Sequence, residues 1–424
     1  MFQITPMYID PGTGSMLFSI ILGAAATLYF LGWAVVLKLK TIALGGKAVR
    51  TVKNKFVIYG EDKRYFSLFE PILNEFERRK IPVLYLTSSE DDPVFGKNYE
   101  CARAEFIGKG NRVFSRLNFL SADVVLSSTP SLDVFQWKRS KSVKHYSHIE
   151  HATGGITMYR GLFMLDYYDS ILLSSGIEVD DLREVERLRK LPPKEIVVVG
   201  CPYLDTYAEK LKSINVEKSD KICVIVSPTW GSDGLLAKYG EIIIDSLAKC
   251  DYKIIVRPHP QSKIVEKALI DRLTERYKST AAIEWDYNPD NIFSLARADI
   301  MISDFSWIMA DYALLFGKPV LYTGENMDLK DTDAYCLKDK PMCLRSFSMI
   351  AQKLAVEDMP RIGEIVEKTL SDKGLSAERE KAVEMFWTNR GEAGARVVDF
   401  LIKKVEQIEG ETTGTRKEVI SEPK

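Results

Sequence analysis

The chain has 424 residues, a formal net charge of −1 and 46% hydrophobic residues. This length exceeds what one hydrophobic core usually supports, so we expect two domains. The balanced charge gives no reason to expect a nucleic-acid partner, and the six scattered cysteines, without a Cys-x-x-Cys pair, are typical of a reducing compartment.

A long apolar stretch lies close to the N-terminus. No charged side chain occurs from Pro11 to Leu37. The apolar part is about 21 residues long, which at about 1.5 Å per residue spans about 30 Å of hydrocarbon. The sequence therefore predicts a transmembrane helix at 16–37 after an extracytoplasmic tail at 1–15. A cleaved signal peptide has a basic start and a shorter apolar stretch, and this segment has neither.

The flanking charges predict the orientation of this helix. No Lys or Arg precedes it, and the basic residues that follow it closely are Lys38, Lys40, Lys47, Arg50, Lys53 and Lys55. The positive-inside rule then predicts a single-pass protein of the cell membrane, with its soluble domains on the cytoplasmic face. Small residues between Gly23 and Gly32 would let a second copy pack closely and form a homo-oligomer, or they simply face lipid.

Short β-branched runs alternate with amphipathic stretches through the rest of the chain. The first half contains predicted strands at Phe56–Gly60, Pro82–Leu86, Asp123–Ser127, Ser170–Ser174 and Glu195–Gly200, and a helix at Tyr65–Arg79. The second half contains predicted strands at Ile222–Ser227, Lys253–Arg257, Asp299–Ser303 and Lys318–Tyr322, and helices at Tyr239–Lys249, Lys263–Arg276 and Ser306–Phe316. After Phe347 the pattern is helical only. Nearly continuous apolar strands separated by helices are typical of parallel sheets covered on both faces.

This alternation predicts an α/β protein with two Rossmann-like domains that face each other across a cleft. The predicted parts are an N-terminal domain at 45–205, a second domain at 206–385, a C-terminal helix at 386–408 and a polar, disordered tail at 409–424. In open parallel sheets, ligands bind beyond the carboxyl ends of the strands, so functional residues are expected there.

Two strand ends in the second half carry residues suited to phosphate. Arg257 and His259 flank a proline, and a guanidinium beside an imidazole suits a phosphoryl group. The alternative is a structural turn. Ser303, Asp304 and Ser306 precede a predicted helix, whose free N–H groups and dipole favour a phosphate. One of these three residues is also explained as a plain N-cap.

The other three histidines are His145, His148 and His151, just before Gly154 and Gly155. Three imidazoles at this spacing could bind a metal, but no cysteine lies nearby and helical ligands would drift around the axis. A catalytic base at the start of a glycine loop fits His151 better, and structural histidines are the remaining alternative. We predict no metal.

In this order the motifs resemble the CDP-glycerol glycerophosphotransferase family, whose members prime or polymerise teichoic-acid-type chains and have a GT-B-like fold. The resemblance covers most of Lys144–Ile408. The matching segments are His151 to Gly176 (the family's His-Gly loop and next strand), Val199–Asp205 (its Gly-x-Pro-x-x-Asp segment), Ser227–Trp230 (its Pro-Thr-Trp turn), Arg257–Pro260 (its second histidine motif), and Ser303–Ser306 with Asp311–Ala313 and Lys318-Pro319 (its nucleotide-diphosphate loop and helix).

Three positions depart from the family pattern. The first histidine of the family usually sits in Trp-His-Gly, whereas here Glu150 and Ala152 flank His151. The second serine of the diphosphate loop is replaced by Trp307. The Asp-Gly-x-Ala segment appears as Arg390-Gly391-Glu392-Ala393.

The resemblance implies a transferase of cell-envelope polymer synthesis. It would move a glycerol-phosphate or related polyol-phosphate unit from a CDP-linked donor such as CDP-glycerol to a hydroxyl of a lipid-linked acceptor of the polyprenyl-diphosphate type, without a bound cofactor. The first domain would take the acceptor and the second the nucleotide. Two alternatives stay open: a GT-B glycosyltransferase that uses another nucleotide-activated donor, and a non-catalytic, membrane-tethered nucleotide-binding protein.

The resemblance also implies roles for single residues. His151 would be the general base, and Arg257 and His259 would stabilise charge on the diphosphate as CMP leaves. The residues expected to hold the nucleotide and its phosphates are Pro228, Thr229, Trp230, Ser303, Asp304, Ser306 and Asp311. Asp331-Thr332-Asp333 has the D-x-D form of metal-using glycosyltransferases, but a polar loop is the favoured interpretation.

Overall fold

The computed structural model describes residues 27–29, 32, 54–216, 219–288, 290–324 and 329–420. It divides into two units, residues 1–52 and 53–424. The predicted transmembrane helix at 16–37 lies outside the described residues apart from 27–29 and 32. Within the described ranges, no helix has both the length and the apolar character needed to cross a bilayer. The anchor therefore stays a prediction.

The first sheet contains seven parallel strands in the order β3-β2-β1-β4-β5-β6-β7. Its strands are β1 (Asn54–Gly60), β2 (Val83–Thr87), β3 (Ala102–Phe106), β4 (Ala122–Ser127), β5 (Val143–Ile149), β6 (Ser170–Leu173) and β7 (Glu195–Val198). The helices along this half are α2 (Phe66–Arg78), α3 (Asn111–Leu117), α4 (Val179–Arg189) and α5 (Pro202–Leu211). The order reverses between β1 and β4, and a parallel sheet commonly binds ligands at such a point.

The second sheet contains six parallel strands in the order β10-β9-β8-β11-β12-β13. Its strands are β8 (Cys223–Val226), β9 (Lys253–Val256), β10 (Ile283–Trp285), β11 (Ile300–Ser303), β12 (Val320–Tyr322) and β13 (Gln352–Lys353). The main helices are α6 (Leu235–Leu247), α7 (Ser262–Val265), α8 (Lys267–Tyr277), α9 (Ile292–Arg297), α10 (Ile308–Phe316), α13 (Ile362–Ser371) and α14 (Lys373–Phe386). Here the reversal lies between β8 and β11.

The prediction of two parallel α/β sheets is confirmed. The prediction of helices alone after Phe347 is wrong at one point, because Gln352 and Lys353 form β13 and pair with β12. The last helix, α15, runs from Ala393 to Ile420 and so continues past residue 408, where the predicted C-terminal helix ends.

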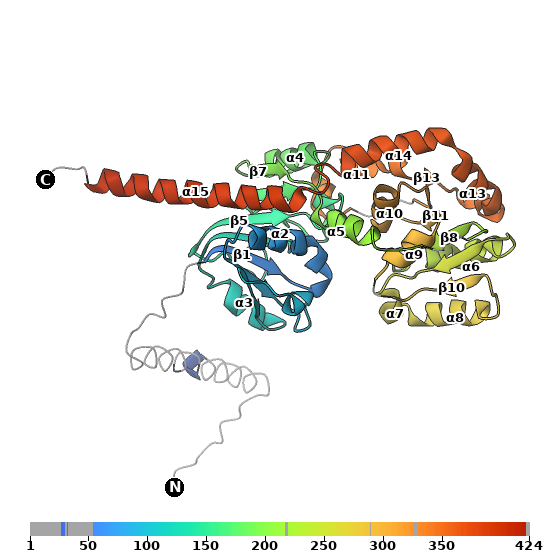
Figure 1. Cartoon of the computed structure of the whole chain (residues 1–424), viewed down its shortest axis with the longest axis horizontal. Helices are drawn as coiled ribbons and strands as arrows, with labels where there is room; N and C mark the ends of the chain where they lie inside the picture. Colours follow the sequence, from blue (N-terminus) through green and yellow to red (C-terminus); the bar gives the residue numbers. More distant parts are fainter. Residues whose placement is uncertain are drawn as a thin grey trace, which may run out of the picture. The chain divides into compact units, whose positions relative to one another are not determined.

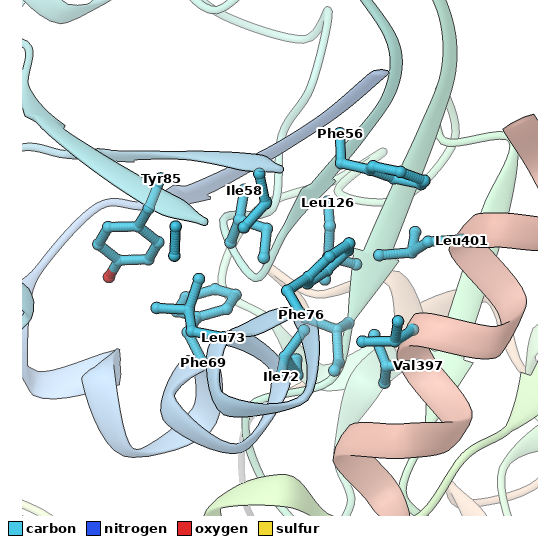
Figure 2. Packing of buried hydrophobic residues seen from close by; sticks show 14 of the residues in the cluster. Phe56, Ile58, Phe69, Ile72, Leu73, Phe76, Tyr85, Leu126, Val397 and Leu401 are labelled. Carbon is cyan, nitrogen blue, oxygen red and sulfur yellow. The ribbon is translucent and has the colours of Figure 1, made fainter. Parts of the chain in front are cut away.

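The helix α15 packs against the first sheet, although it follows the second sheet in sequence (Figure 1). Val397 and Leu401 of α15 lie in one buried cluster with Phe56 of β1 and Phe76 of α2 (Figure 2). Gly394 allows the close approach to α2, because a Cβ atom there would lie 2.7 Å from a backbone oxygen of α2. The chain thus returns to the first sheet after building the second.

A buried acidic side chain joins the two sheets. The backbone N–H groups of Phe163 and Met164 donate to the carboxylate of Asp333 at 2.7 and 3.0 Å, and Arg189 Nη2 donates to the same group at 2.6 Å. Asp333 is 4% exposed. The D-x-D segment therefore contributes an interdomain contact.

Candidate functional site

A pocket of about 440 Å³ opens at the carboxyl ends of β8, β9 and β11. Its lining residues are Ser227, Pro228, Thr229, Arg257, Pro258, His259, Pro260, Asn291, Phe305, Ser306, Trp307 and Ile308. The pocket lies where the strand order of the second sheet reverses, which is the position expected for a ligand. It brings together residues from three of the motifs that the sequence analysis identified.

Asp304 holds together the two loops that line this pocket. Its carboxylate accepts the backbone N–H groups of Thr229 at 2.9 Å, Leu235 at 2.9 Å and Ser306 at 3.1 Å. Burial raises the pKa of Asp304, and these N–H groups oppose that shift. Ser303 also points inward, because its hydroxyl donates to the Ser227 carbonyl at 2.7 Å. Of the three residues predicted to hold phosphates, only Ser306 lines the pocket.

Arg257 is already paired within the protein. Its guanidinium donates to the carboxylate of Asp286 and, at 2.6 Å, to the carbonyl of Asn288. The Arg257 side chain is 11% exposed and that of Asp286 12%. The charge predicted to face the diphosphate is therefore compensated in place, and Arg257 ties the end of β9 to the segment after β10.

His259 presents a neutral imidazole. The Gln261 backbone N–H donates to Nδ1 of His259 at 3.1 Å, so the ring proton belongs on Nε2. Burial lowers the pKa of His259, and the positive charge of Arg64 adds to this effect. The ring of Trp230 lies 6.4 Å from the His259 ring, but Trp230 is 44% exposed and does not line the pocket.

Helix α10 begins at the pocket. Ser306, Trp307 and Ile308 line the pocket at the start of this nine-residue helix. The first-turn N–H groups and the positive end of the helix dipole favour an anion there. Asp311 lies deeper in the protein, where burial raises its pKa to about 6 and the Tyr203 hydroxyl of α5 donates to it. Asp311 therefore joins α10 to α5 and does not line the pocket.

His151 lies in an aromatic enclosure at the carboxyl edge of the first sheet. Its ring stacks on Tyr159 at 5.1 Å with an angle of 8° and meets the edge of Tyr65 at 5.0 Å. The Tyr159 hydroxyl lies 3.3 Å from His151 Nδ1 and 3.3 Å from His148 Nε2. Burial lowers the pKa of His151 to about 4, so its imidazole is neutral at pH 7.

The three clustered histidines do not converge on one point. Successive side chains of a strand alternate between its faces, which separates His145 from His148. His145 bonds the Ser170 hydroxyl through Nε2 at 2.9 Å. Among the residues that the structure describes, no three His, Cys, Asp or Glu side chains are placed to hold a metal ion.

Two buried carboxyl groups near His151 have structural partners that the sequence analysis missed. The backbone N–H groups of Gly155 and Ile156 donate to Oε1 of Glu178 at 2.9 and 3.1 Å. Ser174 donates to Glu150 through its backbone N–H at 2.9 Å and its hydroxyl at 2.7 Å. Burial raises the pKa of both carboxyl groups, and the neighbouring Glu150 raises that of Glu178 further. The pair therefore binds a proton more tightly than two exposed carboxyl groups would.

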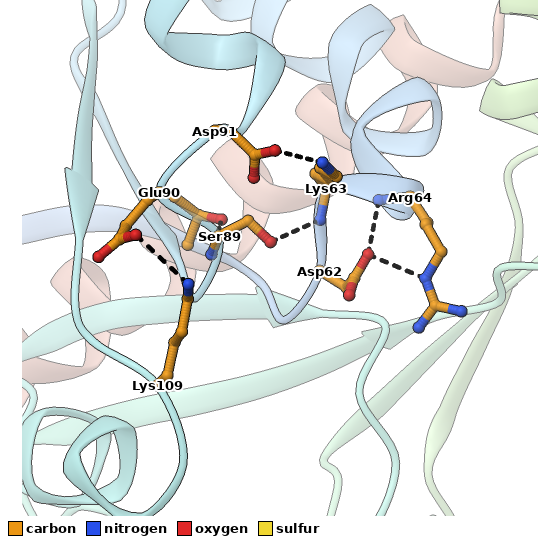
Figure 3. A network of polar contacts seen from close by, with 8 residues as sticks. Asp62, Lys63, Arg64, Ser89, Glu90, Asp91 and Lys109 are labelled. Atoms are coloured by element: carbon orange, nitrogen blue, oxygen red, sulfur yellow. Dashed lines mark hydrogen bonds and ion pairs between the residues drawn. The ribbon is translucent and has the colours of Figure 1, made fainter. Parts of the chain in front are cut away.

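A charged turn after β1 is another feature that the sequence analysis did not identify. Asp62 Oδ1 accepts both the backbone N–H and Nε of Arg64 at 2.9 Å, while Lys63 bonds Asp91 (Figure 3). The positive charge of Arg64 also contributes to the lowered pKa of His259 in the pocket of the second sheet. An ordinary polar turn carries no signal that would have identified it.

Solved structures of low sequence identity share this fold. A UDP-N-acetylglucosamine 2-epimerase from Neisseria meningitidis bound to UDP-GlcNAc aligns with a TM-score of 0.56 and 13% identity over 82% of this chain and 100% of that chain. A putative UDP-N-acetylglucosamine 2-epimerase from Listeria monocytogenes aligns with a TM-score of 0.57 and 12% identity over 84% and 98%. The enzyme from Methanocaldococcus jannaschii in complex with UDP-GlcNAc and UDP gives 0.57 and 15% over 82% and 99%.

These identities support the two-sheet, GT-B-like fold and nothing finer. A search of curated proteins finds no significant match. The family model described as CDP-glycerol:poly(glycerophosphate) glycerophosphotransferase matches residues 171–401, which include β6 to β13 and the pocket. The model covers more than half of the chain, and the protein therefore belongs to this family of transferases.

Proposed function

We propose that the protein transfers a glycerol-phosphate or related polyol-phosphate unit from a CDP-linked donor to a hydroxyl of a lipid-linked acceptor. The pocket at β8, β9 and β11 carries this proposal, because the start of α10 and the neutral His259 together offer hydrogen-bond donors to a diphosphate. Membership of the glycerophosphotransferase family supports the choice of donor. The acceptor is proposed to be of the polyprenyl-diphosphate type.

The reaction needs one proton acceptor and several hydrogen-bond donors. The acceptor hydroxyl attacks the donor phosphorus that bears the polyol, its proton passes to His151, and a new P–O bond forms as the bond to the CMP oxygen breaks. His259 Nε2–H and the N–H groups at the start of α10 stabilise the charge that develops on CMP. The low pKa of His151 keeps the base unprotonated at pH 7.

Arg257 receives a different role in this scheme. The sequence predicts that Arg257 stabilises the diphosphate directly. Because Asp286 and Asn288 already accept its guanidinium donors, we assign it to holding the loop that carries His259. Ser306 remains the side chain of the diphosphate loop that faces the ligand, and Asp304 holds that loop together.

The test is turnover of labelled CDP-glycerol by membranes that contain the full-length protein. We expect His151→Ala and His259→Ala to lower the rate by at least about 100-fold, because each removes one proton-transfer or charge-stabilising group. His145→Ala is the matched control, because the His145 ring bonds Ser170 of the first sheet and packs near Phe400 of α15, away from the pocket. If the first two variants turn over donor like the unaltered protein, the assigned roles are wrong.

The proposed membrane helix has its own test. We propose that it holds the domains at the cytoplasmic face, where a lipid-linked acceptor is confined. Removal of residues 1–37 should preserve donor binding and reduce transfer to acceptor embedded in vesicles. Transfer at full rate to the same vesicles would mean that the segment serves only for targeting.

The residues around His151 favour a second candidate, in which the donor is another nucleotide-linked compound. Glu150 and Ala152 flank His151 here, where the family usually has Trp and Gly. A thermal-shift screen with CDP-alcohols and UDP-sugars separates the two candidates. Stabilisation by UDP-sugars alone would select the second, and binding of CDP-glycerol without turnover would indicate a non-catalytic nucleotide-binding protein.

A further inference from the structure

Trp307 touches both halves of the proposed active site. It precedes α10 and lines the donor pocket of the second sheet. Its indole also covers Gly154 and Gly155, which follow His151 on the first sheet. A Cβ atom at Gly155 would lie 2.5 Å from Cζ2 of the indole, and one at Gly154 would lie 3.1 Å from Cζ3. The contact leaves no room for a side chain at Gly155.

The glycine loop is held from its other side as well. Glu178 accepts the N–H groups of Gly155 and Ile156, so the loop lies between a carboxyl group and the indole. Gly155 has a φ of +84° and Gly154 a φ of +151°, which are conformations that favour glycine. The indole itself is supported by Phe347, whose ring lies 5.3 Å away in an edge-on arrangement. The loop therefore cannot retreat from Trp307 without breaking hydrogen bonds to Glu178.

We propose that Trp307 is a positioning residue that sets the His151 loop against the donor pocket. The proposal rests on the proposed function, because it concerns the distance between the base and the donor phosphorus. The indole on one domain fills the space that side chains at Gly154 and Gly155 would occupy on the other.

The first experiment separates positioning from donor binding. Trp307→Ala should lower kcat roughly 10- to 100-fold, because a displacement of about 1 Å between reacting groups has effects of that order, while the KM for CDP-glycerol stays within about threefold. Trp285→Ala is the matched control, because Trp285 lies on the edge strand β10 outside the pocket. A raised KM at constant kcat would overturn the proposal, since Trp307 would then only contact the donor.

A double-mutant cycle tests the contact itself. Gly155→Ala alone should reduce kcat, because its methyl group meets the indole. In Gly155→Ala/Trp307→Ala that collision is removed, so the loss should be clearly smaller than the product of the single losses. Losses that simply multiply would overturn the proposal. Trp307→Phe replaces Trp307→Ala in both experiments if the alanine variant does not fold.

Failure of the proposed function gives a different result. In that case the unaltered protein does not turn over CDP-glycerol, and the cycle is followed by melting temperature. Non-additive shifts between Gly155 and Trp307 would support the positioning contact without the proposed donor, and additive shifts would overturn it.

Discussion

Arg189 and Asp333 form an ion pair between the two sheets, with Nη2 2.6 Å from Oδ1. Their side chains are 14% and 6% exposed. Arg189 ends α4 and also bonds Asp166 at 2.8 Å, while Asp333 accepts two backbone N–H groups of the first sheet's β5–β6 loop. The pair therefore holds together the two halves that carry His151 and the donor pocket.

Removal of this carboxylate should destabilise the protein strongly. Asp333→Ala leaves the N–H groups of Phe163 and Met164 without an acceptor, while Arg189 keeps its pair with Asp166, so we expect the free energy of unfolding to fall by about 2–3 kcal/mol. Urea unfolding measures the change. Asp358→Ala is the control, because its pair with Arg361 is far more exposed and should contribute about 1 kcal/mol or less. Equal effects of the two variants would contradict the interdomain role.

Asp304 is expected to control donor binding without touching the donor. Asp304→Asn keeps one acceptor oxygen and replaces the other by an N–H donor, so at least one of the N–H groups of Thr229, Leu235 and Ser306 loses its acceptor. We expect a loss of stability of about 1–3 kcal/mol and a CDP affinity at least about 10-fold weaker, measured by calorimetry.

Asp299 supplies the matched control for this experiment. Its Oδ2 accepts the Cys223 backbone N–H at 2.8 Å at the opposite, amino end of the same two strands. Asp299→Asn should therefore lower stability while CDP affinity stays unchanged. If the two variants weaken CDP binding equally, the effect of Asp304 is general unfolding and not the shape of the pocket.

The fold was predictable where a strand contains an uninterrupted apolar run. The runs at Val57-Ile58 and Val124-Val125 are buried on both faces, so their polar neighbours in β1 and β4 do not obscure them. The central strand β5 was not predicted, because Lys144 and His145 interrupt its apolar pattern. In the structure His145 stays in the sheet because its ring bonds the Ser170 hydroxyl. The strands β3, β10 and β13 were missed because edge strands are short and half-exposed.

The site was predictable to the same extent. Thr229, His259 and Ser306 line one pocket because each follows a parallel strand of one sheet, and the carboxyl ends of such strands meet at one edge. The residues that contact the His151 loop were not predictable. Glu178 and Trp307 act on the His151 loop through contacts between segments far apart in sequence, and no local spacing encodes such contacts.

The Glu150–Glu178 pair should make stability depend on pH. A carboxyl group whose pKa is raised in the folded state binds its proton more tightly there, so its contribution is complete below the unfolded pKa, about 4.3, and is lost as pH rises through the raised value. Over that window the free energy of unfolding should fall by up to about 1.4 kcal/mol per pH unit.

Glu178→Gln isolates this contribution. Its amide oxygen can accept the N–H groups of Gly155 and Ile156, and its NH₂ group can donate to Glu150, as a protonated carboxyl group would. We expect urea unfolding of the variant to show a flatter pH profile above pH 5 than the unaltered protein. Parallel profiles would mean that the pair does not hold a proton in the folded protein.

The acid limb of the rate profile should report the unusual environment of His151. Burial lowers the pKa of His151 to about 4, whereas an exposed histidine titrates near 6.5. The neutral base therefore persists as pH falls from 7 to 5, and kcat/KM for CDP-glycerol should stay level across that range before it falls near pH 4. The free energy of unfolding changes in the same direction, because the stability that a lowered histidine pKa contributes is complete above about pH 6.5 and is lost as pH falls toward 4.

Tyr159→Phe keeps the stacked ring but removes the hydroxyl 3.3 Å from Nδ1 of His151, so it should lower kcat with little change in KM. If kcat/KM of the unaltered enzyme instead falls near pH 6.5, His151 is solvated when it acts. Its aromatic enclosure would then have to open before each turnover.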